Sequence, residues 1–138
     1  MLYALLYRSV ATHPVGELSL RALTVRAAQR NKELGVTGVL LHGVHEHLPE
    51  IPGAFLQWIE GPEEAVRKLF ESISDDPRHQ NVETIAEGPL AKLAGTNQRL
   101  FPDWDMEAGT IGELPATLAG FLTYVRRQKR GGGWALAA

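Results

Sequence analysis

The chain has 138 residues, of which 44% are hydrophobic, so we expect one soluble domain with a buried core. A formal net charge of −2 argues against a general nucleic-acid binder, and the lack of cysteine excludes disulfides, thiol catalysis and thiolate metal ligands. The apolar residues 1–7 are too short for a signal peptide or a membrane span, which favours a reduced cytoplasmic location.

The first expected elements are a buried strand and an amphipathic helix. Residues 2–9 alternate with a period of two, as expected of a strand. After a turn at residues 12–16, Ser19 can cap a helix that runs to about Glu33 and ends at Gly35. One stripe of this helix contains Leu20, Leu23, Ala27, Asn31 and Leu34. Asn31 therefore belongs to the face that packs.

The remaining elements complete a βαββαβ order. Strands are expected at residues 37–42 and 54–60, and Pro62 would take the first position of a second helix. A fourth strand covers residues 82–87, and a short fifth surrounds Trp104. A third amphipathic helix presents Leu118, Phe121, Leu122 and Val125. The order predicts an α+β, ferredoxin-like βαββαβ sandwich with two helices on one sheet face, an added strand and a C-terminal helix.

Three polar side chains lie in apolar surroundings and therefore need partners. They are Gln57 in the third strand, Tyr7 in the first strand and Asn31 on the first helix. Strands 1 and 3 are neighbours in this layout, so Tyr7 and Gln57 are expected side by side under the helices. Their uncharged donors and acceptors suit a heteroaromatic ring with carbonyl and N–H edges. The simpler interpretation, three unrelated core polar groups, stays open.

Five segments in the same order resemble the BLUF domain, a family of blue-light sensors that hold a flavin, usually FAD, without a covalent bond. The segments are Tyr7-Arg8-Ser9, Asn31 with Gly35 to Leu41, Phe55 to Gly61, Asp76 to His79, and Phe101 to Met106. The resemblance covers residues 1–108 and leaves residues 109–138 as a helical extension and tail. Two loops, residues 43–53 and 93–98, are longer than the family's pattern, a change that costs little entropy.

The resemblance implies how a flavin would be held. The ring would lie between the first two helices, and Asn31 would bond its carbonyl and imide edge. Arg78 and His79 match a motif implied to contact the flavin's phosphate groups. The apolar walls would be Leu23, Ala27 and Ile73. FAD is the expected cofactor, with FMN as an alternative.

The resemblance also implies a photochemical switch without net chemistry. Tyr7 would donate an electron and a proton, with Gln57 as the relay, and Gln57 would then rotate or change tautomer. The altered hydrogen bond would shift the absorption to the red and reach the sheet around Trp104 and Met106. The chain would then be a stand-alone sensor, not an enzyme. It would signal to a separate protein or through a homo-oligomer, with no nucleic acid or membrane involved.

Other functions remain as alternatives. A degenerate relative without flavin would act as a protein-interaction module. An acylphosphatase-like enzyme shares the fold, but residues 8–13 are not the glycine-rich loop that cradles a phosphate. His42, His45, His47 and Glu50 fit no metal-binding spacing, so no metal site is predicted.

Overall fold

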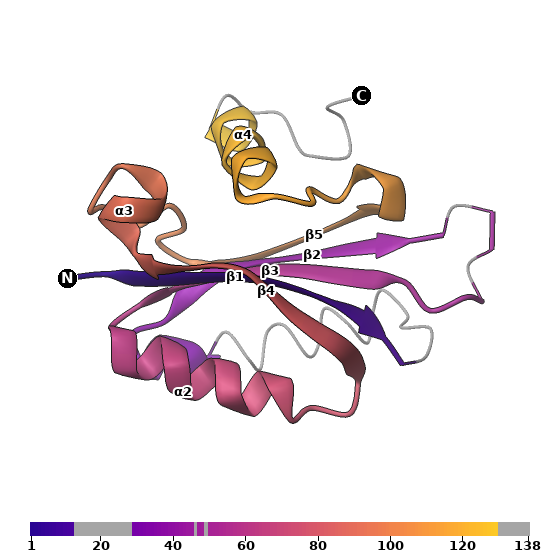
Figure 1. Ribbon diagram of the computed structural model, residues 1–138, viewed down its shortest axis with the longest axis horizontal. Helices are drawn as coiled ribbons and strands as arrows, with labels where there is room; N and C mark the ends of the chain where they lie inside the picture. The colour runs from indigo at the N-terminus through magenta and orange to yellow at the C-terminus, as the bar shows by residue number, and fades with distance from the viewer. Residues whose placement is uncertain (13–28, 46, 49, 130–138) are drawn as a thin grey trace.

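The structure, a computed structural model, describes residues 1–12, 29–45, 47–48 and 50–129. One sheet of five strands, in the order β4-β1-β3-β2-β5, forms its middle layer (Figure 1). Neighbours are antiparallel except β2 and β5, which are parallel. The strands are β1 (Tyr3–Ala11), β2 (Thr37–Val44), β3 (Ala54–Gly61), β4 (His79–Pro89) and β5 (Trp104–Thr110). The order of the first four strands confirms the ferredoxin-like α+β prediction.

Helices cover both faces of this sheet. The helix α2 (Glu63–Ser74) lies on one face, whereas α3 (Leu90–Ala94) and α4 (Leu118–Lys129) lie on the other (Figure 1). A short 3₁₀ helix, η1 (Ile111–Glu113), connects β5 to α4. Within the described part of the chain, no helix combines the length and the apolarity that crossing a membrane requires.

The predicted first helix falls mainly on residues outside the described ranges. Its last turn, residues 29–33, is helical, and Gly35 follows with φ +77°. The Gly35 N–H bonds the carbonyl of Lys32 at 3.0 Å. Glycine adopts this left-handed conformation without the strain that a Cβ causes, so the expected end of the helix at Gly35 is confirmed.

Several element boundaries differ from the prediction. Pro62 is the N-cap of α2, with ψ 138°, and is not its first helical residue, so that expectation is wrong. The strand β4 begins at His79 because it pairs with β1 along almost its full length, although its exposed polar residues hide the strand pattern. The helix α3 was not expected; it follows Pro89, overlaps the start of the longer loop and is capped by Gly95, with φ +71°.

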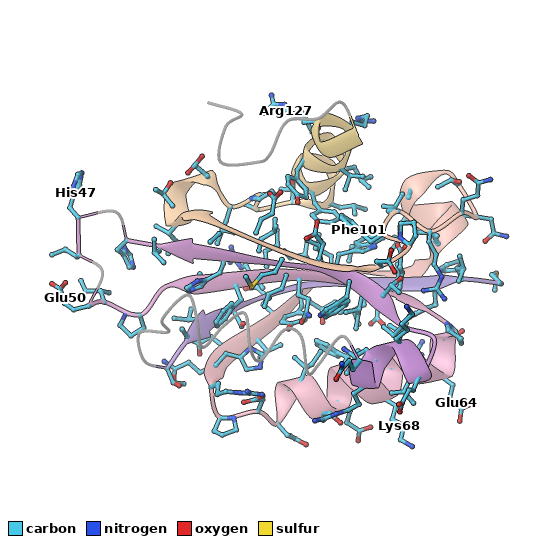
Figure 2. The ribbon with its side chains drawn as sticks, turned by 180° about the vertical axis from the view of Figure 1, so that it is seen from behind. His47, Glu50, Glu64, Lys68, Phe101 and Arg127 are labelled. Carbon is cyan, nitrogen blue, oxygen red and sulfur yellow. The ribbon has the colours of Figure 1, made fainter. Side chains whose placement is uncertain are left out.

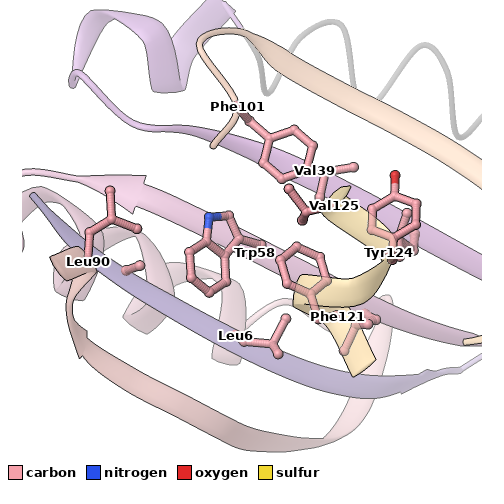
Figure 3. Packing of buried hydrophobic residues seen from close by; sticks show 11 residues of the cluster. Leu6, Val39, Trp58, Leu90, Phe101, Phe121, Tyr124 and Val125 are labelled. Carbon is pink, nitrogen blue, oxygen red and sulfur yellow. The ribbon is translucent and has the colours of Figure 1, made fainter. Parts of the chain in front are cut away.

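Alternate residues of each strand build two separate cores. Tyr3, Leu5, Tyr7, Val36, Ile59 and Val66 pack on the face covered by α2, which we call the α2 face. The opposite face, the α4 face, includes Leu6, Val39, Leu41, Leu56, Trp58 and Phe121 (Figure 3). Trp58 stacks on Phe121 of α4 with ring centroids 5.1 Å apart. Trp58 therefore faces away from Gln57, and the third amphipathic helix packs on the sheet, as its apolar stripe predicts.

Candidate functional site

A row of side chains crosses four strands on the α2 face. Tyr7 of β1 lies opposite Gln57 of β3, Gln57 lies opposite Leu40 of β2, and Leu40 lies opposite Met106 of β5. Tyr7 and Gln57 are buried, and the Tyr7 hydroxyl donates a hydrogen bond to Oε1 of Gln57. The sheet thus joins the predicted phenol and amide directly and connects them, through one leucine, to the edge strand.

The electrostatics of this pair keep it uncharged. Burial raises the pKa of Tyr7, and the negative charge of Asp76 acts in the same direction. The phenol therefore keeps its proton at every physiological pH and remains a donor. Because Oε1 of Gln57 accepts the hydrogen bond from this phenol, the NH₂ group of the amide can donate to another group.

Two aromatic rings fix the position of Tyr7. Phe70 of α2 lies 5.4 Å from the Tyr7 ring, and His79 lies 6.1 Å away in an edge-on arrangement. His79 Nε2 is 2.6 Å from the carbonyl of Ile73, and its Nδ1 is 2.7 Å from the hydroxyl of Ser9. Since the carbonyl can only accept, Nε2 carries a proton and donates it, and in the neutral ring Nδ1 then accepts from the Ser9 hydroxyl. His79 thereby joins β1 to the end of α2.

The other predicted cofactor-binding residues occupy different settings. Asn31 is 4% exposed, as its packing stripe predicts, and Ile73 is half-buried against the α2-face cluster. Arg78 is exposed and donates from Nε to both oxygens of Asp76 at 2.9 Å. Leu23 and Ala27 lie outside the described residues.

Trp104 and Met106 belong to neighbouring parts of the α2 face. Trp104 packs against the cluster that contains Tyr7, and Met106 packs beside Leu40. Trp104 Nε1 is buried without a hydrogen-bond partner in the described structure. Gly38 lies opposite Trp104 in the β2–β5 register, and a Cβ there would lie 2.9 Å from the Trp104 ring. The indole therefore occupies the space that glycine leaves open.

We expect Gly38→Ala to loosen both β2 pairings. The added Cβ would lie 1.8 Å from the carbonyl oxygen of Trp58 and against Trp104, so the strands must move apart. The expected destabilisation is about 1–3 kcal/mol, measured by urea unfolding. Gly112→Ala is the matched control, because nothing lies within 4 Å of its added Cβ. Equal unfolding midpoints for the two variants would contradict this packing.

The residues considered for other functions are dispersed. His42 is buried and stacks on Phe55 at 4.9 Å, and burial lowers its pKa, whereas His47 and Glu50 lie at the outer end of the hairpin (Figure 2). Among the described residues, no group of three or more histidine, cysteine or acidic side chains is suited to a metal ion. Arg8 lies within β1 and pairs with Glu83, so it is part of a strand and not of a loop after it.

Sequence reasoning missed two side chains of this site. Leu40 links Gln57 to Met106, and Phe70 packs on the Tyr7 ring. A period of two in the second strand places Leu40 on the face of Gln57 only once the strand register is known. Phe70 is one of several apolar residues at helical spacing in α2, and that spacing does not distinguish it from the others.

The chemistry of the site fits an uncharged heteroaromatic group such as the flavin ring. Because Oε1 of Gln57 is bonded to Tyr7, its NH₂ group is the end of the amide that can donate to another group, and Trp104 offers a buried N–H without a partner in the described structure. The phenol and the amide lie in a region that a charged ligand would enter only at a large desolvation cost.

Comparison with known proteins agrees with this chemistry. The family described as BLUF, sensors of blue-light using FAD, matches residues 2–107. The photoactivated adenylate cyclase subunit beta of Euglena gracilis is 36% identical over 110 residues, which are 79% of this chain and 11% of that protein. The chain spans 11–12% of the length of the first curated relatives that it matches.

Solved structures give the same result. BlrB, a BLUF protein with a dark-state structure, is 33% identical with a TM-score of 0.59 and covers 88% of this chain and 82% of its own. Klebsiella pneumoniae BlrP1, in a structure with FMN and cyclic diGMP, is 31% identical with a TM-score of 0.63 over 92% of this chain and 30% of its own. With the match over residues 2–107, these likenesses show that the chain belongs to the BLUF family of flavin-binding blue-light sensors.

Proposed function

We propose that this chain senses blue light through the hydrogen bond between Tyr7 and Gln57. The observation that supports the proposal is the buried contact from the Tyr7 hydroxyl to Oε1 of Gln57. A bound flavin would supply the absorption of blue light and an acceptor for one electron. Tyr7 is the electron source nearest to the amide, and its neutral phenol has a proton to release together with that electron.

The proton transfer uses both ends of the amide. Tyr7 would give one electron to a bound flavin and its phenolic proton to Oε1 of Gln57, and the NH₂ group of Gln57 would release a proton toward the flavin. One electron and one proton would then return to Tyr7, so nothing would remain oxidised or reduced. Gln57 is left rotated or as the other tautomer, and it presents a different group to its neighbours. Light thereby shifts a two-state hydrogen-bond network.

The flavin-binding residues are part of the same proposal. Asn31 would bond the polar edge of the ring, while Leu23, Ala27 and Ile73 would contact its apolar surface. Arg78 and His79 would lie toward the phosphates. Both follow α2 in the chain, and His79 lies next to the Tyr7 ring. We propose FAD as the cofactor, with FMN as the alternative because the ring contacts are shared.

The output is proposed to pass through the row from Gln57 to Met106 and to Trp104 on β5. A sensor of this kind needs no catalysis of its own, and a separate signalling protein or a second copy of the chain would receive the signal. The cytoplasmic location and the homo-oligomeric state stay predictions.

The purified protein tests the proposal directly. It is expected to be yellow, to release close to one flavin per chain on denaturation, and to show a red-shifted visible spectrum under blue light that reverts in darkness. Chromatography of the released flavin, and reconstitution with FAD or FMN separately, identifies the cofactor. Colourless protein that takes up neither flavin would overturn the proposal.

One observation favours a second candidate, an interaction module without flavin. The hairpin between β2 and β3 exposes Val44, Leu48 and Ile51, each more than a third exposed. Three exposed apolar side chains on one hairpin offer a candidate surface for a protein partner. Loss of flavin uptake, with retained folding, would favour this function.

A further inference from the structure

A buried carboxylate on the α4 face is not used by the proposed photochemistry. Glu60, at the end of β3, is 0% exposed, and burial raises the pKa of its carboxyl group. One of its oxygens accepts the Trp58 indole N–H at 2.6 Å, and the other accepts the backbone N–H of Phe101 at 3.0 Å. A buried carboxyl group requires such partners, and one of these partners belongs to the segment that leads into β5.

The guanidinium of Arg99 holds the same segment at a second point. It donates to the Thr37 hydroxyl at 2.7 Å, to the Glu60 carbonyl at 3.2 Å and to the Gly35 carbonyl at 2.6 Å. Thr37 and Glu60 lie opposite one another in the β2–β3 register. One side chain therefore bonds the start of β2, the end of β3 and the turn that follows Asn31. A planar group with five donors can reach three such acceptors together, which an ammonium group does less readily.

These contacts lie next to the point where β5 joins the sheet. The pairing of β5 with β2 begins at Trp104 opposite Gly38, the residue that follows Thr37. Only two residues lie between Phe101 and the start of β5 at Trp104, and Phe101 itself is buried between the sheet and α4 (Figures 2 and 3). A shift of the held segment would therefore move the start of β5.

We propose that Glu60 and Arg99 are positioning residues that form a clamp, defined as these two side chains with the bonds given above. The clamp holds residues 99–101 against the ends of β2 and β3 and so sets where Trp104 rests. It keeps the output strand in register while leaving the Tyr7–Gln57 pair on the other face untouched. The role in light signalling rests on the proposed function; the role in placing β5 does not.

Amide hydrogen exchange in darkness tests the placement of β5. In Arg99→Met, exchange of residues 104–110, relative to that of β3, is expected to accelerate about tenfold or more over wild type. Arg99→Lys keeps the charge and part of the bonding, so its relative exchange rate in β5 is expected to lie between those of wild type and Arg99→Met. Arg8→Gln is the matched control, because it removes an exposed arginine whose partner among the described residues is Glu83, and it should leave the ratio unchanged. Equal acceleration of β5 and β3 in Arg99→Met would overturn the clamp.

A second variant keeps the test valid if Arg99→Met does not fold. Glu60→Gln preserves the shape of the side chain but replaces one acceptor by a donor, so either Trp58 or Phe101 loses its bond. The ratio of β5 to β3 exchange is expected to rise in this variant as well. An unchanged ratio in Glu60→Gln would count against the clamp.

Illumination of the flavin-loaded protein tests the signalling role. Wild type is expected to change its β5 exchange in light. Arg99→Met is expected to keep the red shift, because Arg99 does not touch Tyr7 or Gln57, and to lose most of the light-induced change in β5. An undiminished change would overturn the signalling role. A wild type without any red shift would instead refute the proposed function, while the dark exchange ratio would still decide whether the clamp exists.

Discussion

Tyr7→Phe is expected to bind flavin and to show no red shift under blue light. The phenyl ring keeps its packing against Phe70 and His79 but has no proton to give to Gln57 and no phenol to oxidise. The measurement is the light-minus-dark visible spectrum of the flavin-loaded variant. We also expect about 1–3 kcal/mol lower stability in urea, because Oε1 of Gln57 loses its buried partner.

Tyr3→Phe is the matched control for this variant. Tyr3 lies on the same strand and the same sheet face, but its hydroxyl donates to Glu87 and accepts from Arg67. The Tyr3→Phe variant should therefore keep the red shift. A normal red shift in Tyr7→Phe would show that Tyr7 is not the electron and proton donor.

Phe121→Ala is expected to destabilise the fold by about 3–5 kcal/mol, the usual cost of removing a large buried aromatic side chain. Phe121 is fully buried and contacts three rings, those of Trp58 at 5.1 Å, Tyr124 at 5.8 Å and Phe101 at 6.3 Å (Figure 3). Its loss leaves a cavity between α4 and the sheet. Urea unfolding followed by circular dichroism measures the free energy of unfolding.

Thr123→Ala on the same helix is the control for Phe121→Ala. Thr123 is exposed, and its hydroxyl bonds only its own helix among the contacts described, so the change should stay within about 0.5 kcal/mol. Under conditions where the Phe121→Ala protein is folded, that variant should keep the red shift, because Phe121 lies on the sheet face opposite Gln57. A loss of stability below about 1 kcal/mol in Phe121→Ala would mean that α4 does not bury this core.

Much of the fold could be predicted because local patterns and long-range pairing agree. The alternation in β1 and β3, the stop at Gly35 and the apolar stripe of α2 each indicate an element, and the βαββαβ order then leaves few topologies. That order makes β1 and β3 neighbours, and the register of the structure then pairs Tyr7 with Gln57. Strand β4 extended further than predicted because an edge strand with polar residues has no clear hydrophobic signal.

The contacts around β5 could not be predicted from sequence. Arg99 directly follows what looked like an inserted loop, and its three acceptors are 39, 62 and 64 residues away along the chain. Glu60 looked like the polar end of a strand, yet it is fully buried. Such interactions depend on the register of strands that are distant in sequence, and local propensity contains no information about them.

The central claim is that Gln57 changes its hydrogen bonding in light, and light-minus-dark infrared spectroscopy of the bound flavin tests this most directly. The carbonyl stretch of the flavin reports the hydrogen bond that it accepts. Wild type is expected to show a shifted carbonyl band that recovers in darkness, and Gln57→Leu, which has no amide, is expected to show none. The same reversible shift in Gln57→Leu would contradict the account.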